Sequence, residues 1–453
     1  MIIVSESAAE LKRFLGQSGL ILSHQLMVMR MVLGFMMHRG RMSCSAAAGS
    51  LASDPIHRGE LTRFLARPRW RKHDFNQPLM RALLARERCR GEFMFLLDAT
   101  LVSQAGRKTQ NTYSTGNRGR RPAKGRRYGK HKIVYKKVHG FTFGLLITPS
   151  GIRIPMQIPH YTDDYSQAHG ITQLTTAEAA AQLVRTLALP AKVKVVVIGD
   201  TAYESAVVCQ ACEALGYTWI FPANPGRVYA GKKGEREPLR SRLKDWERLS
   251  QTRIRLQAST GKYAKYRRLS RWRVGPKLKE RVFYAHQEKR EVRNVGYVQL
   301  VFSTTKANLE HATPDDVKIL MTNALDRSPR EVIELYSLRW QIELFFKELK
   351  PTLGFDQYSF HDFQAVVAWV ECAITTVLYL EHERLRHMQD RRLTAKQRRW
   401  WDMQRLHGLC HAFRQQCTAN ERKYLARQLK TRHGVEKLHR VLTAAIPREY
   451  QAA

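Results

Sequence analysis

The chain has 453 residues, enough for two or three domains with sizeable cores, and 43% hydrophobic with 9% aromatic residues excludes an intrinsically disordered protein. Lys and Arg total 77 against 39 Asp and Glu, so the formal net charge is +38. The expected partner is a polyanion, and nucleic acid is favoured over a membrane because no long uninterrupted apolar span occurs.

The start of the chain and its cysteines favour the cytoplasm. The first residues, MIIVSESAAELKRFL, lack the basic start and apolar run of a secretory signal. Seven Cys in so long a chain do not form a disulfide framework. Cys209 and Cys212 form a CxxC within a helical pattern without a second pair nearby, which disfavours a metal or redox site.

Residues 1–90 are predicted to be helical, with apolar periodicity through Leu11 to Met37. Within this region Ser43 can cap a short helix, and Asp54 with Pro55 can begin another, which gives a helix-turn-helix-like outline. Two interpretations stay open. The helices form either a DNA-end recognition module that uses nearby arginines or a small helical bundle with a basic surface.

The next segment, EFMFLLDATLVS, predicts a strand that ends near Asp98. Residues 99–162 contain no Asp or Glu, and residues 107–137 hold twelve Lys and Arg. We expect this segment to be a mobile basic loop that binds DNA phosphates. Its candidate DNA-binding residues are Arg107, Lys108, Arg126, Arg127 and Lys130.

Two further strands, a helix and a fourth strand follow Asp98. The strands KIVYKKVHGFTFGLLITP and GIRIPMQIPH are joined by a Pro-Ser-Gly turn, TTAEAAAQLVRTLAL predicts a helix, and AKVKVVVIGD predicts a central strand that ends at Asp200. This order resembles that of a ribonuclease-H-like core. In that fold the first and fourth strands are neighbours, which implies that Asp98 and Asp200 lie close together.

Residues 223–321 are basic, contain tryptophan and are rich in predicted strands, so we interpret them as a β-rich insertion. Trp246 and Trp272 lie among Arg and Lys. Either ring could stack on an extruded base, although core packing is the favoured interpretation for each.

The segment SPREVIELYSLRWQIELFFKELK, residues 328–350, predicts a helix because Ser328 can cap it, Pro329 suits its first position and Glu331 completes a capping box. At 100° per residue, Leu335, Leu338, Ile342, Phe345 and Leu349 form an apolar stripe. The adjoining strip carries Tyr336, Arg339, Glu343 and Lys350.

This Y-(2)-R-(3)-E-(6)-K spacing resembles the YREK signature of bacterial insertion-sequence transposases of the DDE class, the insertion-sequence-four-like group. DTAYES at Asp200 also resembles the second-carboxylate motif of that group. The resemblance implies an α/β fold in which a ribonuclease-H-like catalytic core with a β-rich insertion is flanked by N-terminal and C-terminal helical regions. It also implies Mg²⁺-dependent DNA cleavage and strand transfer.

We expect Asp98, Asp200 and Glu343 to be the catalytic metal ligands, because carboxylate oxygens suit two Mg²⁺ ions, with Mn²⁺ able to substitute. Asp98 is expected to bind both ions. Arg339, Lys350 and Tyr336 are expected to position DNA phosphates.

The expected organisation has a helical DNA-binding region (1–90), the first part of the core (91–222), the insertion (223–321), the second part of the core (322–380) and a basic helical region (381–453). An apolar helix near Val366 to Leu380, interrupted by Glu371, is predicted to be too short for a bilayer and to be buried.

The expected partners are double-stranded DNA, as terminal inverted repeats and target, and a second copy of the chain in a DNA-bound homodimer. We expect no membrane association and a bacterial cytoplasmic, nucleoid-associated protein. Two alternatives remain. One is a noncatalytic DNA-binding regulator derived from a transposase, and the other is a ribonuclease-H-like DNA nuclease without strand transfer.

Overall fold

The computed structural model describes most of the chain, and all structural statements below concern this part. It comprises residues 8–38, 40–51, 56–67, 70, 74–88, 90–106, 108–118, 133–187, 189–190, 192–231, 236–257, 262–267, 280–307, 309 and 312–445.

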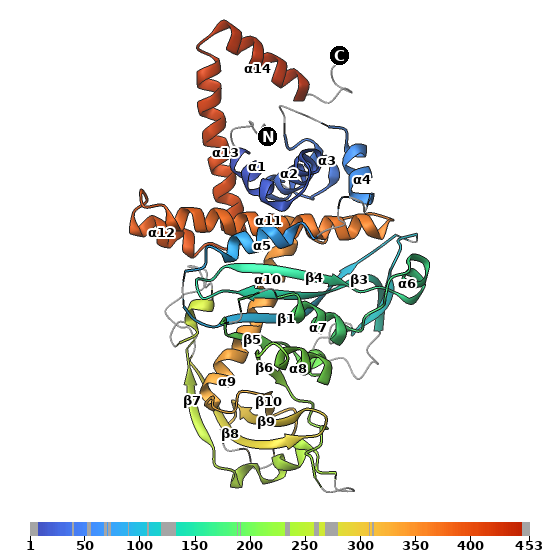
Figure 1. Ribbon diagram of the computed structural model, residues 1–453, viewed down its shortest axis with the longest axis vertical. Helices are drawn as coiled ribbons and strands as arrows, with labels where there is room; N and C mark the ends of the chain where they lie inside the picture. Colours follow the sequence, from blue (N-terminus) through green and yellow to red (C-terminus); the bar gives the residue numbers. More distant parts are fainter. Residues whose placement is uncertain are drawn as a thin grey trace, which may run out of the picture.

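One mixed sheet of ten strands forms the centre of the molecule (Figure 1). Its strands are β1 (Phe93–Ser103), β2 (Tyr113–Arg118), β3 (Ile133–Ile147), β4 (Arg153–Pro159), β5 (Val195–Ile198), β6 (Thr218–Pro222), β7 (Thr252–Leu256), β8 (Arg281–Val292), β9 (Gly296–Thr304) and β10 (Lys318–Thr322). The order is β2-β3-β1-β5-β6-β10-β9-β8-β7, and β4 pairs with β3. Among the strands that the structure describes, only the β1–β5 and β5–β6 pairs are parallel.

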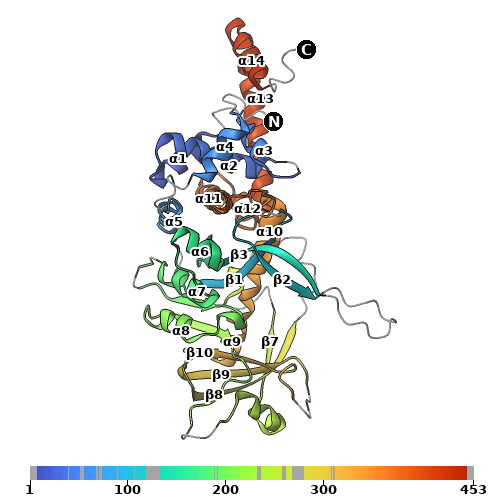
Figure 2. The ribbon, with the colours of Figure 1, turned by 90° about the vertical axis from the view of Figure 1, so that its right-hand side faces the viewer.

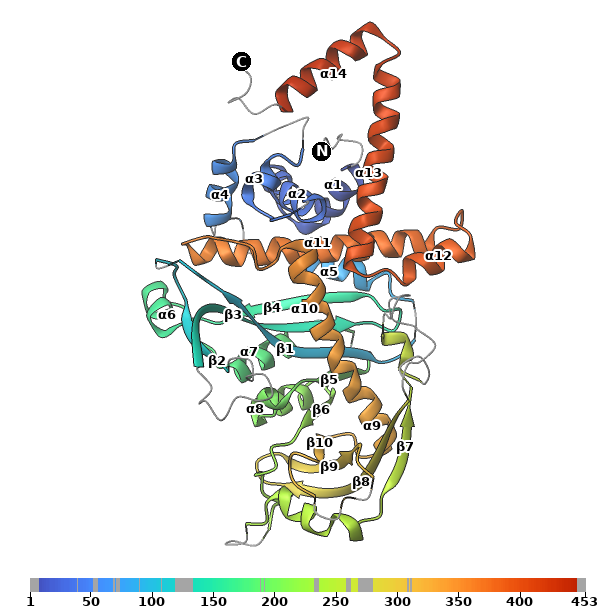
Figure 3. The same ribbon diagram turned by 180° about the vertical axis from the view of Figure 1, so that it is seen from behind.

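Helices cover both faces of the sheet and form a separate layer above it (Figure 2). Helices α7 (Thr176–Arg185) and α8 (Ala206–Glu213) pack on one face, whereas α10 (Trp340–Leu353) crosses the other face beside β1 (Figure 3). This mixed α/β arrangement is compatible with the ribonuclease-H-like core that the sequence suggests.

The remaining helices gather at both ends of the sequence. The N-terminal helices α1 (Ala9–Leu15), α2 (Leu22–Met37), α3 (Cys44–Ala48), α4 (Arg58–Ala66) and α5 (Asn76–Leu84) lie near α11 (Phe363–Gln389), and α6 (Asp163–His169) follows β4. The C-terminal helices are α12 (Ala395–Asp402), α13 (Leu406–Gln428) and α14 (Arg432–Ala445), and α9 (Pro329–Tyr336) precedes α10.

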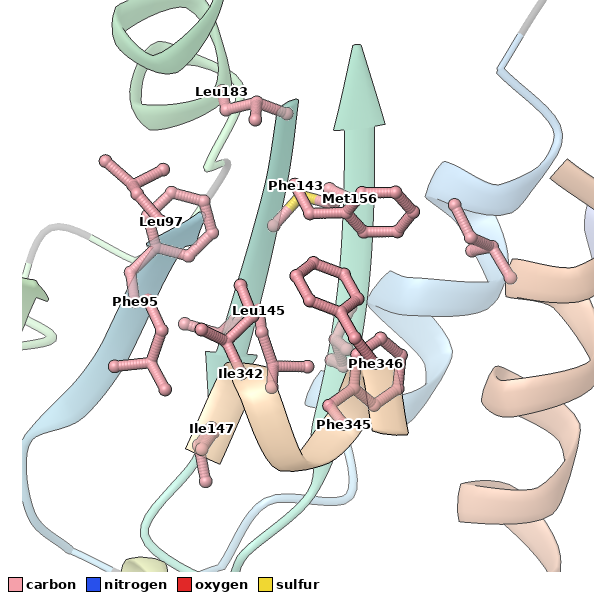
Figure 4. Packing of buried hydrophobic residues seen from close by; sticks show 14 of the residues in the cluster. Phe95, Leu97, Phe143, Leu145, Ile147, Met156, Leu183, Ile342, Phe345 and Phe346 are labelled. Atoms are coloured by element: carbon pink, nitrogen blue, oxygen red, sulfur yellow. The ribbon is translucent and has the colours of Figure 1, made fainter. Parts of the chain in front are cut away.

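The apolar side of α10 fixes this helix against the sheet. All five residues of the predicted apolar stripe are buried. Ile342 and Phe345 face the side chains of β3, and the Phe346 ring meets the Phe143 ring at a centroid distance of 5.3 Å (Figure 4). Fully burying a side chain of this size stabilises the fold by about 1.5–3 kcal/mol. The burial therefore holds the polar side of α10 in place beside β1.

Helix α11 corrects one expectation. At 27 residues it is the one described helix long and apolar enough to cross a membrane by length and composition, so the predicted shortness of this stretch is wrong. The predicted burial is confirmed, because Val366, Trp369, Val377 and Leu380 are almost inaccessible within the protein.

Three local predictions also change. Strand β1 continues five residues past Asp98, because Thr100 and Val102 are buried in alternation with exposed residues. The basic segment is not wholly a loop, since β2 pairs with β3 within it. Helix α4 begins after His57, which caps it with Glu60, while Asp54 and Pro55 lie outside the described residues. Ser43 caps α3 as predicted.

Candidate active site

Asp98 and Asp200 lie side by side just beyond the parallel pairing of two strands, Asp98 within β1 and Asp200 after the carboxyl end of β5. Leu96 of β1 pairs with Ile198 of β5, and each aspartate follows its strand partner by two residues. The Asp98 carboxylate accepts a hydrogen bond from Ala99 N (2.9 Å). The Asp200 carboxylate caps the 3₁₀ turn η3 (Thr201–Tyr203) and accepts from Ala202 N (2.9 Å). The parallel register thus brings together two acids that are 102 residues apart in the sequence.

The third acid reaches the same place from α10. Ser328 caps α9, as predicted, and the backbone stays right-handed through the 3₁₀ turn η6 (Ser337–Arg339) into α10. The predicted single helix is therefore interrupted by one tighter turn. Arg339 donates to Glu343 and lies 3.8 Å from the Asp98 carboxylate, so this guanidinium joins the acid of β1 to the acid of α10.

The electrostatics confirm that the acids face one another. Burial raises the pKa of Asp98 to about 6, the Ala99 amide and Arg339 oppose the rise, and the nearby Asp200 and Glu343 add to it. Burial opposes the charge of Arg339, yet its pKa is raised because Tyr336, Glu343 and Asp98 surround it. The acids thus carry more negative charge than the one arginine that they share can offset.

The carboxylate set has the chemistry to bind hard cations such as Mg²⁺, which prefer oxygen ligands. Among the described residues, however, only Glu10, His382 and Glu383 place three ligand atoms within 4.8 Å of one another. The ligand atoms of Asp98, Asp200 and Glu343 do not come within that distance of one another, and the Arg339 side chain contacts both Asp98 and Glu343. A bound cation would take over the neutralising role of this arginine.

Tyr336 and Lys350 lie on either side of the acids. The Tyr336 hydroxyl accepts a hydrogen bond from Lys318 Nζ (3.2 Å). Lys350 Nζ donates to the carbonyl oxygen of Leu101 on β1 (3.1 Å), and burial lowers its pKa. Arg339 and Lys350 therefore contact β1 from η6 and α10, whereas Tyr336, at the end of α9, contacts Lys318 of β10.

Most of the predicted basic-loop residues cannot be placed. Lys108 is exposed. Arg107, Arg126, Arg127 and Lys130 lie outside the described residues.

Two features of the site were not predicted. Trp340 follows Arg339, is 48% exposed and carries Lys347 Nζ over its ring at 4.8 Å. Its position directly after Arg339 in the sequence could have indicated that Trp340 lies near the site. Tyr203 is buried against the two aspartates, and its pKa is raised by burial and then by Asp98 and Asp200.

Thr142, on the neighbouring strand β3, is a third polar residue near the aspartates that was not predicted. Thr142 is opposite Ala99 on β3, and its hydroxyl lies 2.7 Å from His160 Nε2. A hydroxyl on a strand gives no local signal, which is why sequence reasoning missed this contact.

The structure describes one of the two tryptophans considered for base stacking and both cysteines of the CxxC. Trp246 is 1% exposed, so it packs in the core and does not offer a free face to a base. Trp272 lies outside the described residues. Cys209 and Cys212 are buried free thiols on α8.

Residues 167–378 match the family model described as Transposase DDE domain. The matched region includes Asp200 and Glu343 and begins after Asp98. The match supports a DDE transposase family, a class of metal-dependent enzymes that process DNA. It therefore supports a transposase for this chain, and with it DNA as a binding partner. No curated protein matches the chain.

Proposed function

We propose that this chain is an insertion-sequence transposase of the YREK, insertion-sequence-four-like group, with a ribonuclease-H-like catalytic core. It binds the terminal inverted repeats of its element, cleaves DNA there and joins the freed 3′ ends to target DNA. The observation that carries this proposal is the meeting of Asp98, Asp200 and Glu343 from two parallel strands and one helix.

Asp98, Asp200 and Glu343 would hold two Mg²⁺ ions, or Mn²⁺ in their place. The pKa of Asp98 is raised by burial first and then by Asp200 and Glu343, and a cation bound at these acids would relieve both effects. When bound, two such metal ions would activate the attacking oxygen and stabilise the leaving oxygen of an in-line displacement.

The other side chains of the site would hold the DNA. Arg339 is paired with acids in the protein alone, and its planar guanidinium can instead grip a phosphate with two hydrogen bonds. Lys350 and Tyr336 would contact flanking phosphates. Trp340 and Lys347 offer an exposed ring and a cation on the same helix, a combination that suits an unpaired base and its phosphate.

The rest of the proposal concerns the assembly. The N-terminal helical region (1–90) would recognise DNA ends, and the segment containing Arg107, Lys108, Arg126, Arg127 and Lys130 would contact phosphates. Two copies would act together on paired ends in the bacterial cytoplasm, at the nucleoid. The domain boundaries predicted from the sequence remain part of this proposal.

A plasmid assay tests the function. The nucleotide sequence beside the gene should supply matched inverted repeats, and a supercoiled plasmid that carries both is incubated with the protein and Mg²⁺. We expect nicking or double-strand breaks at the repeat ends, followed by joined products. Asp98→Asn should bind the plasmid without cutting it, whereas Asp245→Asn, at an exposed acid, should behave as the wild type does.

The same assay separates the alternatives. Cleavage without joined products would indicate a ribonuclease-H-like nuclease. Binding without any cleavage by the wild type, with either metal, would indicate a noncatalytic regulator.

A further inference from the structure

A second charged feature lies at the opposite ends of the same two strands. A cavity of about 550 Å³ opens where β1 and β5 begin, whereas Asp98 and Asp200 lie beyond the other end of the β1–β5 pairing. Its lining comes from residues 90–93, 192–194 and 262–266. The last of these segments contains the 3₁₀ turn η5 (Ala264–Tyr266).

The cavity is strongly positive. Its exposed cations Arg90, Lys192, Lys194 and Lys265 have no ion-pair partner among the described residues. Lys262, the fifth cation, pairs with Glu331 at 3.0 Å. Four positive charges therefore surround one cavity without a matching carboxylate.

The carboxylate that does line the cavity is already neutralised. Glu92 forms an ion pair with Arg327, in which both side chains are largely buried. The Tyr263 hydroxyl accepts from Arg327 Nη1 at 2.8 Å and donates to Glu92 at 3.3 Å. Glu92 thus contributes little negative potential to the cavity.

Hydrogen bonds join the walls of the cavity to one another and to α9. Tyr263 and Tyr266 are buried, and the Tyr266 hydroxyl donates to the carbonyl oxygen of Glu92. The amide of Tyr263 donates to Glu334 of α9 at 3.3 Å. The segment that carries Lys262 and Lys265 is thus bonded both to the start of β1 and to α9.

We propose that this cavity binds a backbone phosphate of double-stranded DNA, as a second anchor away from the acids. Five residues of β1 separate Phe93 from Asp98, which is about 17 Å along the strand. A duplex spans that distance in about five base pairs. The identity of the ligand as DNA rests on the proposed function, whereas the preference for phosphate follows from the uncompensated cations.

The test measures how DNA binding depends on salt. The double variant Lys192→Ala/Lys194→Ala is compared with Lys244→Ala/Lys289→Ala, which removes two exposed lysines that do not line the cavity. Each phosphate contact contributes about 0.9 to the slope of log affinity against log salt. We expect the cavity variant to lower the slope by about 0.9 to 1.8 and the control to leave it unchanged. For one lost contact, the ratio of affinities at 50 and 200 mM salt shrinks about 3.5-fold.

Phosphate ethylation interference gives a direct readout on a duplex that contains one repeat end. Ethylation about five base pairs from the cleaved bond should weaken binding of the wild type and of the control, but not of the cavity variant. Equal slopes and equal interference in both variants would overturn the inference while leaving the transposase proposal standing. Failure of the wild type to bind DNA would instead overturn the proposed function.

A second experiment tests whether the cavity binds a free phosphate compound in place of a DNA phosphate. Inorganic pyrophosphate is added, and the melting temperature is measured for the wild type and the cavity variant. Stabilisation of the wild type alone, together with unchanged DNA slopes, would assign the cavity to a free phosphate compound and would contradict the DNA anchor.

Discussion

Two clusters of acidic side chains in this protein differ in how far neighbouring arginines compensate their negative charge. Glu10 of α1 meets His382 and Glu383 of α11, and these three residues place ligand atoms within 4.8 Å of one another. Each acid there has its own arginine. Arg13 pairs with Glu10, and Arg386 donates to both oxygens of Glu383 at 3.0 and 2.7 Å.

Asp98, Asp200 and Glu343 are spaced more widely but have fewer cationic partners. Asp98 and Glu343 share the single guanidinium of Arg339. The pKa of Asp98 is about 6 as a result of burial and of the neighbouring acids. In the other cluster, burial lowers the pKa of His382, so the ring is neutral and each acid is matched by an arginine.

We infer from this contrast that unmatched charge, more than close spacing of ligands, decides where a cation binds. A cation is attracted to the charge that the protein leaves unmatched, and the Glu10 cluster leaves almost none. We therefore interpret the Glu10 cluster as a structural contact between α1 and α11. The proposed metal site is the cluster of Asp98, Asp200 and Glu343, called the Asp98 cluster below. The following predictions test this difference.

The largest expected effect is on catalysis. Asp98→Asn should reduce Mg²⁺-dependent cleavage at least about 1,000-fold, because an amide cannot supply the charge that the metal site needs. Glu383→Gln should cleave at the wild-type rate at a temperature where it is folded. Rates are measured on the plasmid with paired ends. Cleavage retained by the first variant and lost in the second would reverse the assignment of the two clusters.

Much of this site could be predicted from the sequence because its parts carry local signals. The apolar run before Asp200 predicts a buried strand, and the Ser328 cap predicts the start of α9, which the hydrogen bond from Glu331 N to Ser328 Oγ confirms. The parallel pairing of β1 and β5 then follows from the order of elements. The acids are thus located by patterns that each span a few residues.

The rest depends on contacts between distant segments. Lys350 bonds to a backbone carbonyl 249 residues away, and nothing near Lys350 in the sequence specifies that partner. The η6 turn was also missed, because Ser337, Leu338 and Arg339 are compatible with an ordinary helix. The cavity escaped prediction for the same reason, since its cations come from three separate segments.

The second effect is on stability in metal-free buffer. The pKa of Asp98 is about 6 in the folded protein against an ordinary 3.8, so between these values the folded state holds a proton that the unfolded state releases. Stability from this group is therefore lost as pH rises from about 4 to 6. Asp98→Asn should be more stable than the wild type above pH 6, by at most about 3 kcal/mol.

Unfolding is followed by denaturant titration at pH 4.5 and pH 7.5 with a chelator present. The advantage of Asp98→Asn should be small at the lower pH and full at the higher pH. An advantage that is equal at both values would show that the charge of Asp98 is compensated in the folded protein.

The third effect has the opposite sign. Glu383→Gln should destabilise the protein by about 2 kcal/mol, because the half-buried Arg386 loses a bidentate, charge-assisted partner. Glu291→Gln, at an exposed acid of β8, serves as the matched control and should change stability little. A stability gain in Glu383→Gln would mean that the Glu10 cluster, like the Asp98 cluster, carries unmatched negative charge.

The smallest effect separates the clusters by metal binding alone. A ligand at ten times its dissociation constant stabilises the folded state by about 1.4 kcal/mol, so Mg²⁺ should raise the melting temperature of the wild type modestly. The rise should persist in Glu10→Gln, whose cluster has no unmatched charge to offer, and should vanish in Asp98→Asn. If Glu10→Gln abolished the rise, Mg²⁺ would be binding between α1 and α11, and close spacing of ligands would outweigh unmatched charge in this protein.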